Sequence, residues 1–218
     1  MSAPRLRLYH YWRSSCSWRT RWAFELKGLK LDEITHVDIL KGETRSPEHF
    51  ARNPMGALPV LEFLDQPAAS PLRFLTESMA IIEWLDETQP GYKILPADPL
   101  LRARARQLAE TVNSGSQPVQ NHSVALRHSD DPEERKRWGQ HWITRGLSSY
   151  EKLCAPIAGR FSIGDSLTLA DLFLIPQCYN AIRYEVALPD SLRRIYEAAR
   201  ATPECQAAEP EKWEPRGK

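Results

Sequence analysis

The chain has 218 residues, of which 42% are hydrophobic and 26% are charged, and its formal net charge is +1. This composition is ordinary for a globular protein with an ample core. A net charge so close to zero provides no overall field that would favour nucleic acid or a membrane surface as a partner. The residues before Leu6 contain no apolar run long enough for a signal peptide or a membrane span.

The four cysteines, at positions 16, 154, 178 and 205, show neither metal-ligand spacing nor a Cys-x-x-Cys pattern. A chain of this size needs no disulfide to fold. We therefore expect a cytoplasmic protein without a bound metal.

The first 88 residues alternate short strand-like and helix-like segments. Strands are expected at residues 6–11, 33–37, 58–63 and 71–74. Helices are expected at residues 18–27, from 46 onward and from 76 onward, and the first of them follows the start cluster Ser14–Ser17 and ends at Gly28. The order is βαβ, then α, then ββα, and the Leu58–Pro59 bond is a candidate for the cis form.

A proline-rich connector at residues 89–98 is the clearest boundary in the chain. It predicts an α/β domain at residues 1–88 and an all-helical domain at residues 99–218. Within the second domain we expect one or two helices over residues 100–127, with a bend near 115–118, and another over 133–153. Thr168 and Asp171 form a capping-box pattern that opens a helix to about residue 183, with Pro176 inside it. Only the tail after Pro203 lacks a clear pattern.

The first candidate for chemistry is the turn Arg13–Ser17, between an expected strand and an expected helix. Backbone N–H groups at a helix N-terminus stabilise an anion, and a serine hydroxyl can donate a hydrogen bond to it. If the anion is a thiolate, both effects lower the pKa of the thiol. Simple N-capping by serine explains the same residues. Alternatively the thiol of Cys16 is itself an activated nucleophile, although Ser15 and Ser17 supply no resolving thiol.

The second candidate combines Leu58–Pro59 with Glu77–Ser78. A peptide can pair in strand fashion with the backbone of the residue before such a proline. The Glu–Ser pair offers a carboxylate and a hydroxyl to a second peptide end, although capping alone would also account for it.

Together these segments resemble a cytosolic glutathione transferase, and the sequence Tyr-Trp-Arg-Ser-Ser-Cys-Ser-Trp-Arg at residues 11–19 looks like the signature of the zeta class, the maleylacetoacetate isomerase family. The similarity runs from about Leu6 to Leu188. Further matching stretches are residues 53–55, 80–85, 95–96, 117–121, 164–171 and 175–177.

The resemblance implies a thioredoxin-like N-terminal domain that binds glutathione, and an all-helical domain that binds the substrate. It implies that Ser14 activates the glutathione sulfur, within a catalytic turn that includes Ser15 and Cys16. The other positions that match glutathione contacts are Ser17, Leu58, Pro59, Glu77, Ser78, Gln117, Asn121 and Ser123. Arg13 and Arg183 are the expected anchors for substrate carboxylates. Two positions depart from the class: Glu77 stands where Gln is more usual, and His122 replaces an apolar residue.

The implied reaction is the cis–trans isomerisation of maleylacetoacetate to fumarylacetoacetate, a step of tyrosine and phenylalanine catabolism, in a homodimer. Maleylpyruvate isomerase is an alternative, but His122–Ser123 stand where that relative tends to have arginines after the residue that matches Asn121. Glutathione transfer to, or dehalogenation of, α-halo acids would use the same thiolate. A glutathione-binding module without turnover is disfavoured because it would not need a thiolate-activating hydroxyl.

Overall fold

The computed structural model describes residues 4–215. The first three residues of the expected N-terminal domain and the last three of the expected C-terminal domain lie outside it. The chain divides into two compact units. One consists of the residues up to Tyr92 together with the segment from Glu204 onward, and the other spans Lys93–Pro203. The C-terminal segment, which the sequence pattern places in the helical domain, thus packs with the first unit.

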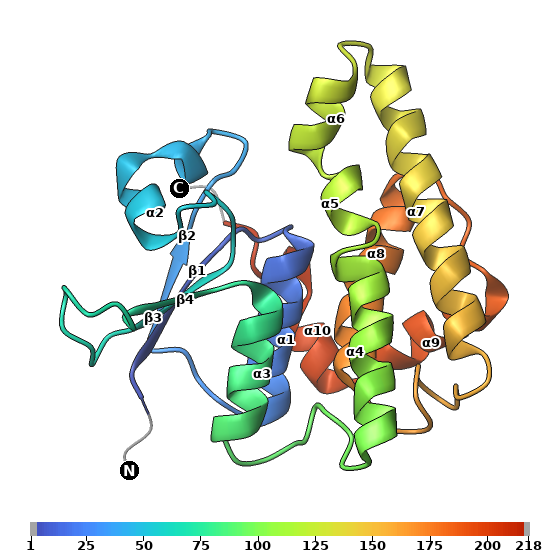
Figure 1. Cartoon of the computed structure of the whole chain (residues 1–218), viewed down its shortest axis with the longest axis horizontal. Coiled ribbons are helices and arrows are strands. Elements are labelled where there is room, and N and C mark those ends of the chain that lie inside the picture. The colour runs from blue at the N-terminus through green and yellow to red at the C-terminus, as the bar shows by residue number, and fades with distance from the viewer. Residues whose placement is uncertain (1–3, 216–218) are drawn as a thin grey trace. The chain divides into compact units, whose positions relative to one another are not determined.

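The first unit is built on one four-stranded mixed sheet in the order β2-β1-β3-β4. Strand β1 pairs in parallel with β2 and antiparallel with β3, and β3 pairs antiparallel with β4. Helices α1 and α3 lie on one face of this sheet and α2 on the other (Figure 1). The strands are β1 (Leu6–His10), β2 (Glu33–His36), β3 (Val60–Phe63) and β4 (Phe74–Thr76). The helices are α1 (Ser15–Lys27), α2 (Pro47–Arg52), α3 (Ser78–Thr88) and α10 (Pro203–Ala208), with 3₁₀ turns η1 (Glu43–Arg45) and η2 (Pro210–Lys212).

The expected α/β order is confirmed, with one strand misplaced. Strand β4 begins at Phe74, whereas the sequence pattern put the fourth strand at residues 71–74. Residues 70–73 instead form a turn, in which the Arg73 N–H donates to the Ser70 carbonyl (3.2 Å) and the Leu72 N–H to the Ser70 hydroxyl (3.2 Å). The side-chain bond of a serine to nearby backbone competes with strand pairing at this place.

The core of the first unit lies between α1, α3 and the sheet. Trp18 and Trp22 of α1 and Ile81 and Leu85 of α3 are almost completely buried. The ends of α1 follow the expected chemistry, with Ser14 as N-cap and Gly28 as C-cap in the left-handed conformation (φ 63°) that glycine adopts without strain.

The second unit is all-helical. Its central helix is α8, which packs against α4, α7 and α9. The helices are α4 (Pro99–Asn113), α5 (Gln117–Gln120), α6 (His122–His128), α7 (Pro132–Cys154), α8 (Leu169–Arg183) and α9 (Asp190–Arg200). Between residues 4 and 215 no helix is both long and apolar enough to cross a membrane.

The expectation of one or two helices over residues 100–127 is wrong, because this stretch forms three. Helix α4 ends at Asn113, and Pro118 occupies the first turn of α5, where a missing N–H is tolerated. Asn121 is extended (φ −60°, ψ 142°) and separates α5 from α6. The bend that the sequence predicts near residue 115 is therefore followed by a second interruption.

The capping box at the start of α8 is confirmed. The Asp171 carboxylate accepts hydrogen bonds from the backbone N–H of Thr168 (2.8 Å) and of Ser162 (2.9 Å) and is fully buried. Pro176 lies inside α8 as expected. Asp171 therefore fixes both the start of the central helix and the loop that precedes it.

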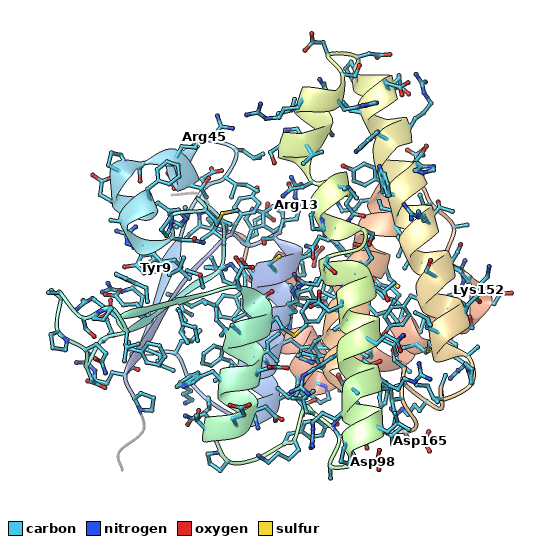
Figure 2. All side chains as sticks on the ribbon, in the orientation of Figure 1. Tyr9, Arg13, Arg45, Asp98, Lys152 and Asp165 are labelled. Atoms are coloured by element: carbon cyan, nitrogen blue, oxygen red, sulfur yellow. The ribbon has the colours of Figure 1, made fainter. Side chains whose placement is uncertain are left out.

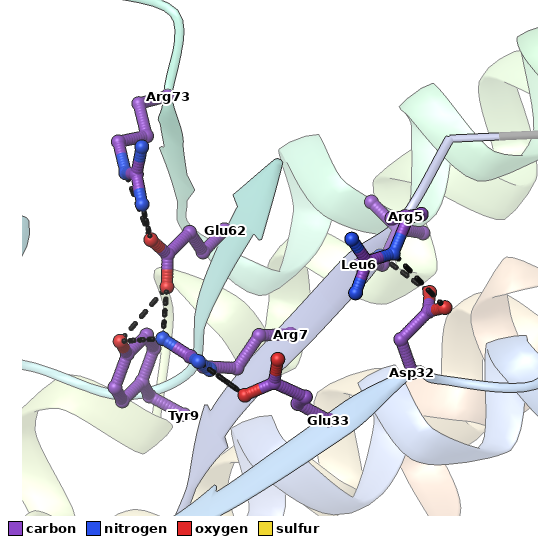
Figure 3. Close-up of polar contacts among 8 residues, drawn as sticks. All are labelled: Arg5, Leu6, Arg7, Tyr9, Asp32, Glu33, Glu62 and Arg73. Atoms are coloured by element: carbon purple, nitrogen blue, oxygen red, sulfur yellow. Dashed lines mark hydrogen bonds and ion pairs between the residues drawn. The ribbon is translucent and has the colours of Figure 1, made fainter. Parts of the chain in front are cut away.

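On the first unit's sheet, the buried carboxylate of Glu62 accepts hydrogen bonds from three residues (Figure 3). Glu62 Oε2 accepts from Tyr9 Oη (2.8 Å) and Arg7 Nη1 (2.9 Å), and Oε1 accepts from Arg73 Nε (2.8 Å). Burial by itself raises the pKa of Glu62, but the hydrogen bonds from Tyr9 and Arg73 and the charges of both arginines hold the pKa below its ordinary value. Glu62 thus joins the two antiparallel strand pairs of the sheet.

Glu62→Gln should lower the free energy of unfolding by about 2 kcal/mol at pH 7, because it weakens hydrogen bonds to a charged acceptor. Since the pKa is depressed in the folded protein, this stabilisation is complete above the unfolded-state pKa of about 4.3 and is lost as pH falls through the folded-state pKa. Urea denaturation at pH 7 and at pH 3 measures both effects.

The matched control is Glu33→Gln, which removes the exposed partner of Arg7 on the neighbouring strand. It should cost less than about 1 kcal/mol at either pH. Equal losses of unfolding free energy in the two variants would show that burial of Glu62 does not strengthen its contribution to stability.

Candidate active site

Three segments that the sequence singles out lie at one edge of the sheet. Val60, the first residue of β3, pairs with Tyr9 near the end of β1 and with Thr76 at the end of β4. The turn after β1, the Leu58–Pro59 bond before β3 and Glu77 after β4 therefore lie next to one another. The register of the strands alone brings these segments together.

The turn between β1 and α1 is closed by its serines. The Ser14 Oγ accepts from the backbone N–H of Ser17 (3.2 Å), and the Ser14 N–H donates to the Tyr11 carbonyl (3.1 Å). The buried Ser17 hydroxyl accepts from the Tyr11 N–H (3.3 Å). As Ser14 uses only a lone pair for capping, its O–H proton is left to donate to an anion at the helix start.

The last four residues of this turn, 14–17, differ in solvent exposure. Ser14, Ser15 and Cys16 are partly exposed, whereas Ser17 is completely buried and its hydroxyl is engaged within the turn. Any contact of Ser17 with a ligand would have to come from its backbone. The hydroxyls of Ser14 and Ser15 and the thiol of Cys16 are the groups that a ligand can reach.

The Leu58–Pro59 peptide bond is cis, as the sequence suggests. Leu58 packs on a small apolar cluster of Tyr9, Val37 and Val60. The loop before it is held at the Ala57 carbonyl, which accepts from Asn53 Nδ2 (3.0 Å) and lies 3.0 Å from His49 Nε2.

Glu77 and Ser78 begin α3 in an unusual backbone conformation. Glu77 has φ 65° and ψ 114°, a region that costs a residue with a side chain about 1–3 kcal/mol. Its side chain is exposed, whereas Ser78 is buried. Strain of this kind at a helix start that also carries an exposed carboxylate points to a binding role.

Arg19 links two of these segments, and the sequence interpretation missed it. Its buried guanidinium donates from Nε to the Ser78 hydroxyl (2.8 Å) and from Nη2 to the Cys16 sulfur (2.8 Å). The only sequence signal was its place at the end of the nine-residue motif.

Cys16 differs from the other three cysteines of the chain, all of which are buried. Burial raises the pKa of Cys154 to about 11 and raises that of Cys178 further. Cys154 and Cys178 are therefore inert packing residues, and Cys16 is the accessible thiol.

A second buried arginine, Arg21, supports the turn from the other side. Its Nη2 donates to the Trp12 carbonyl (3.0 Å) and to the Ala208 carbonyl (3.1 Å) of α10. Its Nη1 lies 3.1 Å from His10 Nδ1, and its guanidinium stacks on Trp213. The tail, for which the sequence shows no clear pattern, thus forms α10 and η2 and is attached to the turn through Arg21.

Of the remaining expected site residues, Arg13 belongs to the first unit and the others to the second. Gln117 begins α5, while Asn121 and Ser123 are exposed at the start of α6, beside the exposed His122. Arg183 ends α8 and is exposed, with its guanidinium 6.0 Å from the Tyr179 ring centre. In the first unit, Arg13 lies over the Trp12 ring at the turn before α1 (Figure 2).

Comparison with known proteins shows the family of the chain. Residues 13–88 match the family described as "Glutathione S-transferase, N-terminal domain". Maleylacetoacetate isomerase from Anaeromyxobacter dehalogenans 2CP-1, crystallised with glutathione in its active site, is 44% identical with a TM-score of 0.87, over 100% of both chains. Maleylacetoacetate isomerase from Rhizobium meliloti is 42% identical over 83% of this chain and 84% of its own. A bacterial maleylpyruvate isomerase, described as a zeta-class glutathione S-transferase, is 34% identical with a TM-score of 0.87, over 97% of this chain and 100% of its own.

The fold and the family match together show that the chain is a glutathione transferase. Within that class, the chain belongs to the zeta-class, or maleylacetoacetate isomerase, family, as the motif at residues 11–19 predicts.

The contact between Arg21 and His10 generates a prediction about pH. Because a guanidinium can only donate, the facing His10 nitrogen accepts, and the ring is neutral. Burial, with the charge of Arg21 and the nearby His36, lowers the pKa of His10 to about 3. The unfolded chain binds this proton below pH of about 6.5, so stability should fall by about 2 kcal/mol between pH 7 and pH 5 on account of this residue.

His10→Asn retains an acceptor for Arg21 and removes the titrating group. In urea unfolding, the loss of unfolding free energy between pH 7 and pH 5 should therefore be smaller by about 2 kcal/mol than in the parent protein. His141→Asn, at an exposed position of α7, should keep the slope of the parent protein. If His10→Asn also keeps that slope, His10 is not neutral in the folded state at pH 5.

Proposed function

We propose that the protein is a glutathione-dependent isomerase that converts maleylacetoacetate to fumarylacetoacetate. The observation that carries the proposal is the cap of α1, in which the Ser14 oxygen accepts from the Ser17 N–H. Because capping uses only a lone pair, the Ser14 O–H can donate to a thiolate. A relative named maleylacetoacetate isomerase, crystallised with glutathione, shares the fold over the whole chain, and another is similar in sequence over 83% of it.

The residues of the sheet edge fit an extended peptide with anionic ends. The start of α1 offers N–H groups and a hydroxyl to a thiolate. The backbone of Leu58, before the buried Pro59, would pair with the cysteinyl residue in strand fashion. Glu77 and Ser78 would bind the ammonium and carboxylate of the γ-glutamyl end. For Gln117, Asn121 and Ser123 of the helical unit, a role in glutathione binding is proposed on the family resemblance alone.

When bound, glutathione supplies a thiolate that adds to the cis double bond, makes it single so that it can rotate, and leaves as the trans double bond re-forms. Ser14 donates a hydrogen bond that keeps the sulfur ionised before addition and after release. Ser15 and Cys16 complete the turn around the sulfur. Arg13 and Arg183 bind the substrate carboxylates, a task to which guanidinium forks are suited.

Three further features are proposed on the family relationship alone: the enzyme acts as a homodimer, it is located in the cytoplasm, and it takes part in tyrosine and phenylalanine catabolism. Sedimentation equilibrium of the purified protein would show about twice the mass of the chain, 25.0 kDa.

The reaction is tested by incubating the purified protein with maleylacetoacetate, maleylpyruvate and dichloroacetate, with and without glutathione. We expect fumarylacetoacetate to form only with glutathione, and without net consumption of it. Turnover without a thiol would refute the mechanism, and a higher kcat/KM for maleylpyruvate would favour the related isomerase reaction.

In the same assay Arg183→Ala should raise the KM of the dicarboxylate more than it changes kcat.

Ser14→Ala should lower kcat by about 10²-fold, because it removes one donor that stabilises an anion. It also removes the cap of α1, which costs about 1 kcal/mol. Ser46→Ala, which removes the equivalent cap of α2, controls for this loss and should keep kcat. A normal kcat in Ser14→Ala would transfer the role to Ser15 or Cys16.

A further inference from the structure

Arg19 contacts both helix starts at the sheet edge. It lies on α1, one turn after Cys16, and it is only 1% exposed. Its Nε donates to Ser78 Oγ at the start of α3, and its Nη2 donates to Cys16 Sγ at the start of α1. A lysine has one nitrogen in place of this rigid fork and could not hold both partners in the same way.

The contact with Arg19 also determines how the Ser78 hydroxyl can form a further hydrogen bond. Because Ser78 Oγ accepts from Arg19, its own O–H is left to donate to another acceptor. The same division holds at Ser14, whose oxygen accepts from the Ser17 N–H. Each of the two helix starts therefore has a hydroxyl whose lone pair is bound within the protein and whose proton remains for a ligand.

Stability alone is a weak reason to keep a cation at this position. Burying a charge is costly, and a well-packed apolar residue often serves a helix interface as well. Helices α1 and α3 are in any case joined elsewhere by the ion pair of Lys27 with Asp86 (2.8 Å). Arg19, in contrast, contacts one residue at the start of each of the two helices, Cys16 on α1 and Ser78 on α3.

We propose that Arg19 is a positioning residue of the glutathione site, which fixes the thiol-binding turn at Cys16 relative to the γ-glutamyl-binding residue Ser78. The proposal rests on the glutathione-dependent function above. A ligand that spans both segments binds more tightly when the protein has already fixed their spacing.

The test is calorimetric titration with glutathione of the full chain and of Arg19→Met, which keeps the stem and removes both donors. The Kd should rise about 10-fold. In the isomerase assay the KM for glutathione should rise likewise, while kcat at saturating glutathione stays within about threefold. Arg19→Lys, which can satisfy one partner, should show an intermediate Kd.

The matched control is the double variant Lys27→Met with Asp86→Leu, which replaces the other α1–α3 link by an apolar pair. Its Kd for glutathione should equal that of the parent protein. A merely structural role of Arg19 would lower the fraction of binding-competent protein in the titration and leave the Kd unchanged.

An unchanged Kd in folded Arg19→Met, or an equal rise in the control, would overturn the proposal. If Arg19→Met does not fold, Arg19→Lys decides, and a Kd equal to that of the parent overturns it. Binding of glutathione without isomerisation would refute the proposed reaction but not the role of Arg19. Absence of glutathione binding in the parent protein would overturn both.

Discussion

Val60 pairs with Tyr9 on one side and with Thr76 on the other, and the assembly of the first unit's site depends on this register. Successive residues of a strand point to opposite faces, so a slip by one residue would expose the buried side of β3 and displace Leu58 and Glu77 together. Glu62 opposes such a slip, because its carboxylate binds Arg7 on β1 and Arg73 next to β4. The polar cluster on the sheet thus protects an alignment that the site uses at the sheet edge.

Helix α1 carries two buried arginines on different sides. Residues two apart on a helix do not share a face, and Arg19 accordingly reaches Ser78 while Arg21 reaches Trp12 and Ala208. Burial lowers the pKa of Arg21 to about 9, which still leaves it charged at neutral pH. One helix therefore connects the site turn to α3 through one cation and to the C-terminal segment through the other.

Local chemistry predicted most of the first unit. The cap at Ser14, the glycine at position 28 and the cis bond at Pro59 are each set by a few neighbouring residues, and the structure has them. The start of β4 was missed because the Ser70 hydroxyl favours a turn over strand pairing. The C-terminal segment looked patternless because its order comes from Arg21, which lies far away in the sequence. Arg19 was overlooked for the same reason, since its importance depends on a contact with Ser78 that only folding creates.

A serine at position 14 suits two tasks of one side chain, the capping of α1 and the proposed stabilisation of a thiolate. Aspartate and asparagine cap helices as well as serine does. An aspartate carboxylate, however, can only accept, and its charge would raise the pKa of a thiol beside it. An asparagine accepts and donates through different atoms, so the amide that caps the helix would aim its donor elsewhere. A hydroxyl accepts from the Ser17 N–H and donates from the same oxygen, which places the donated proton at the start of α1, where the helix N–H groups also favour an anion. The requirements of folding and of the proposed thiolate stabilisation therefore coincide on a single atom, Ser14 Oγ.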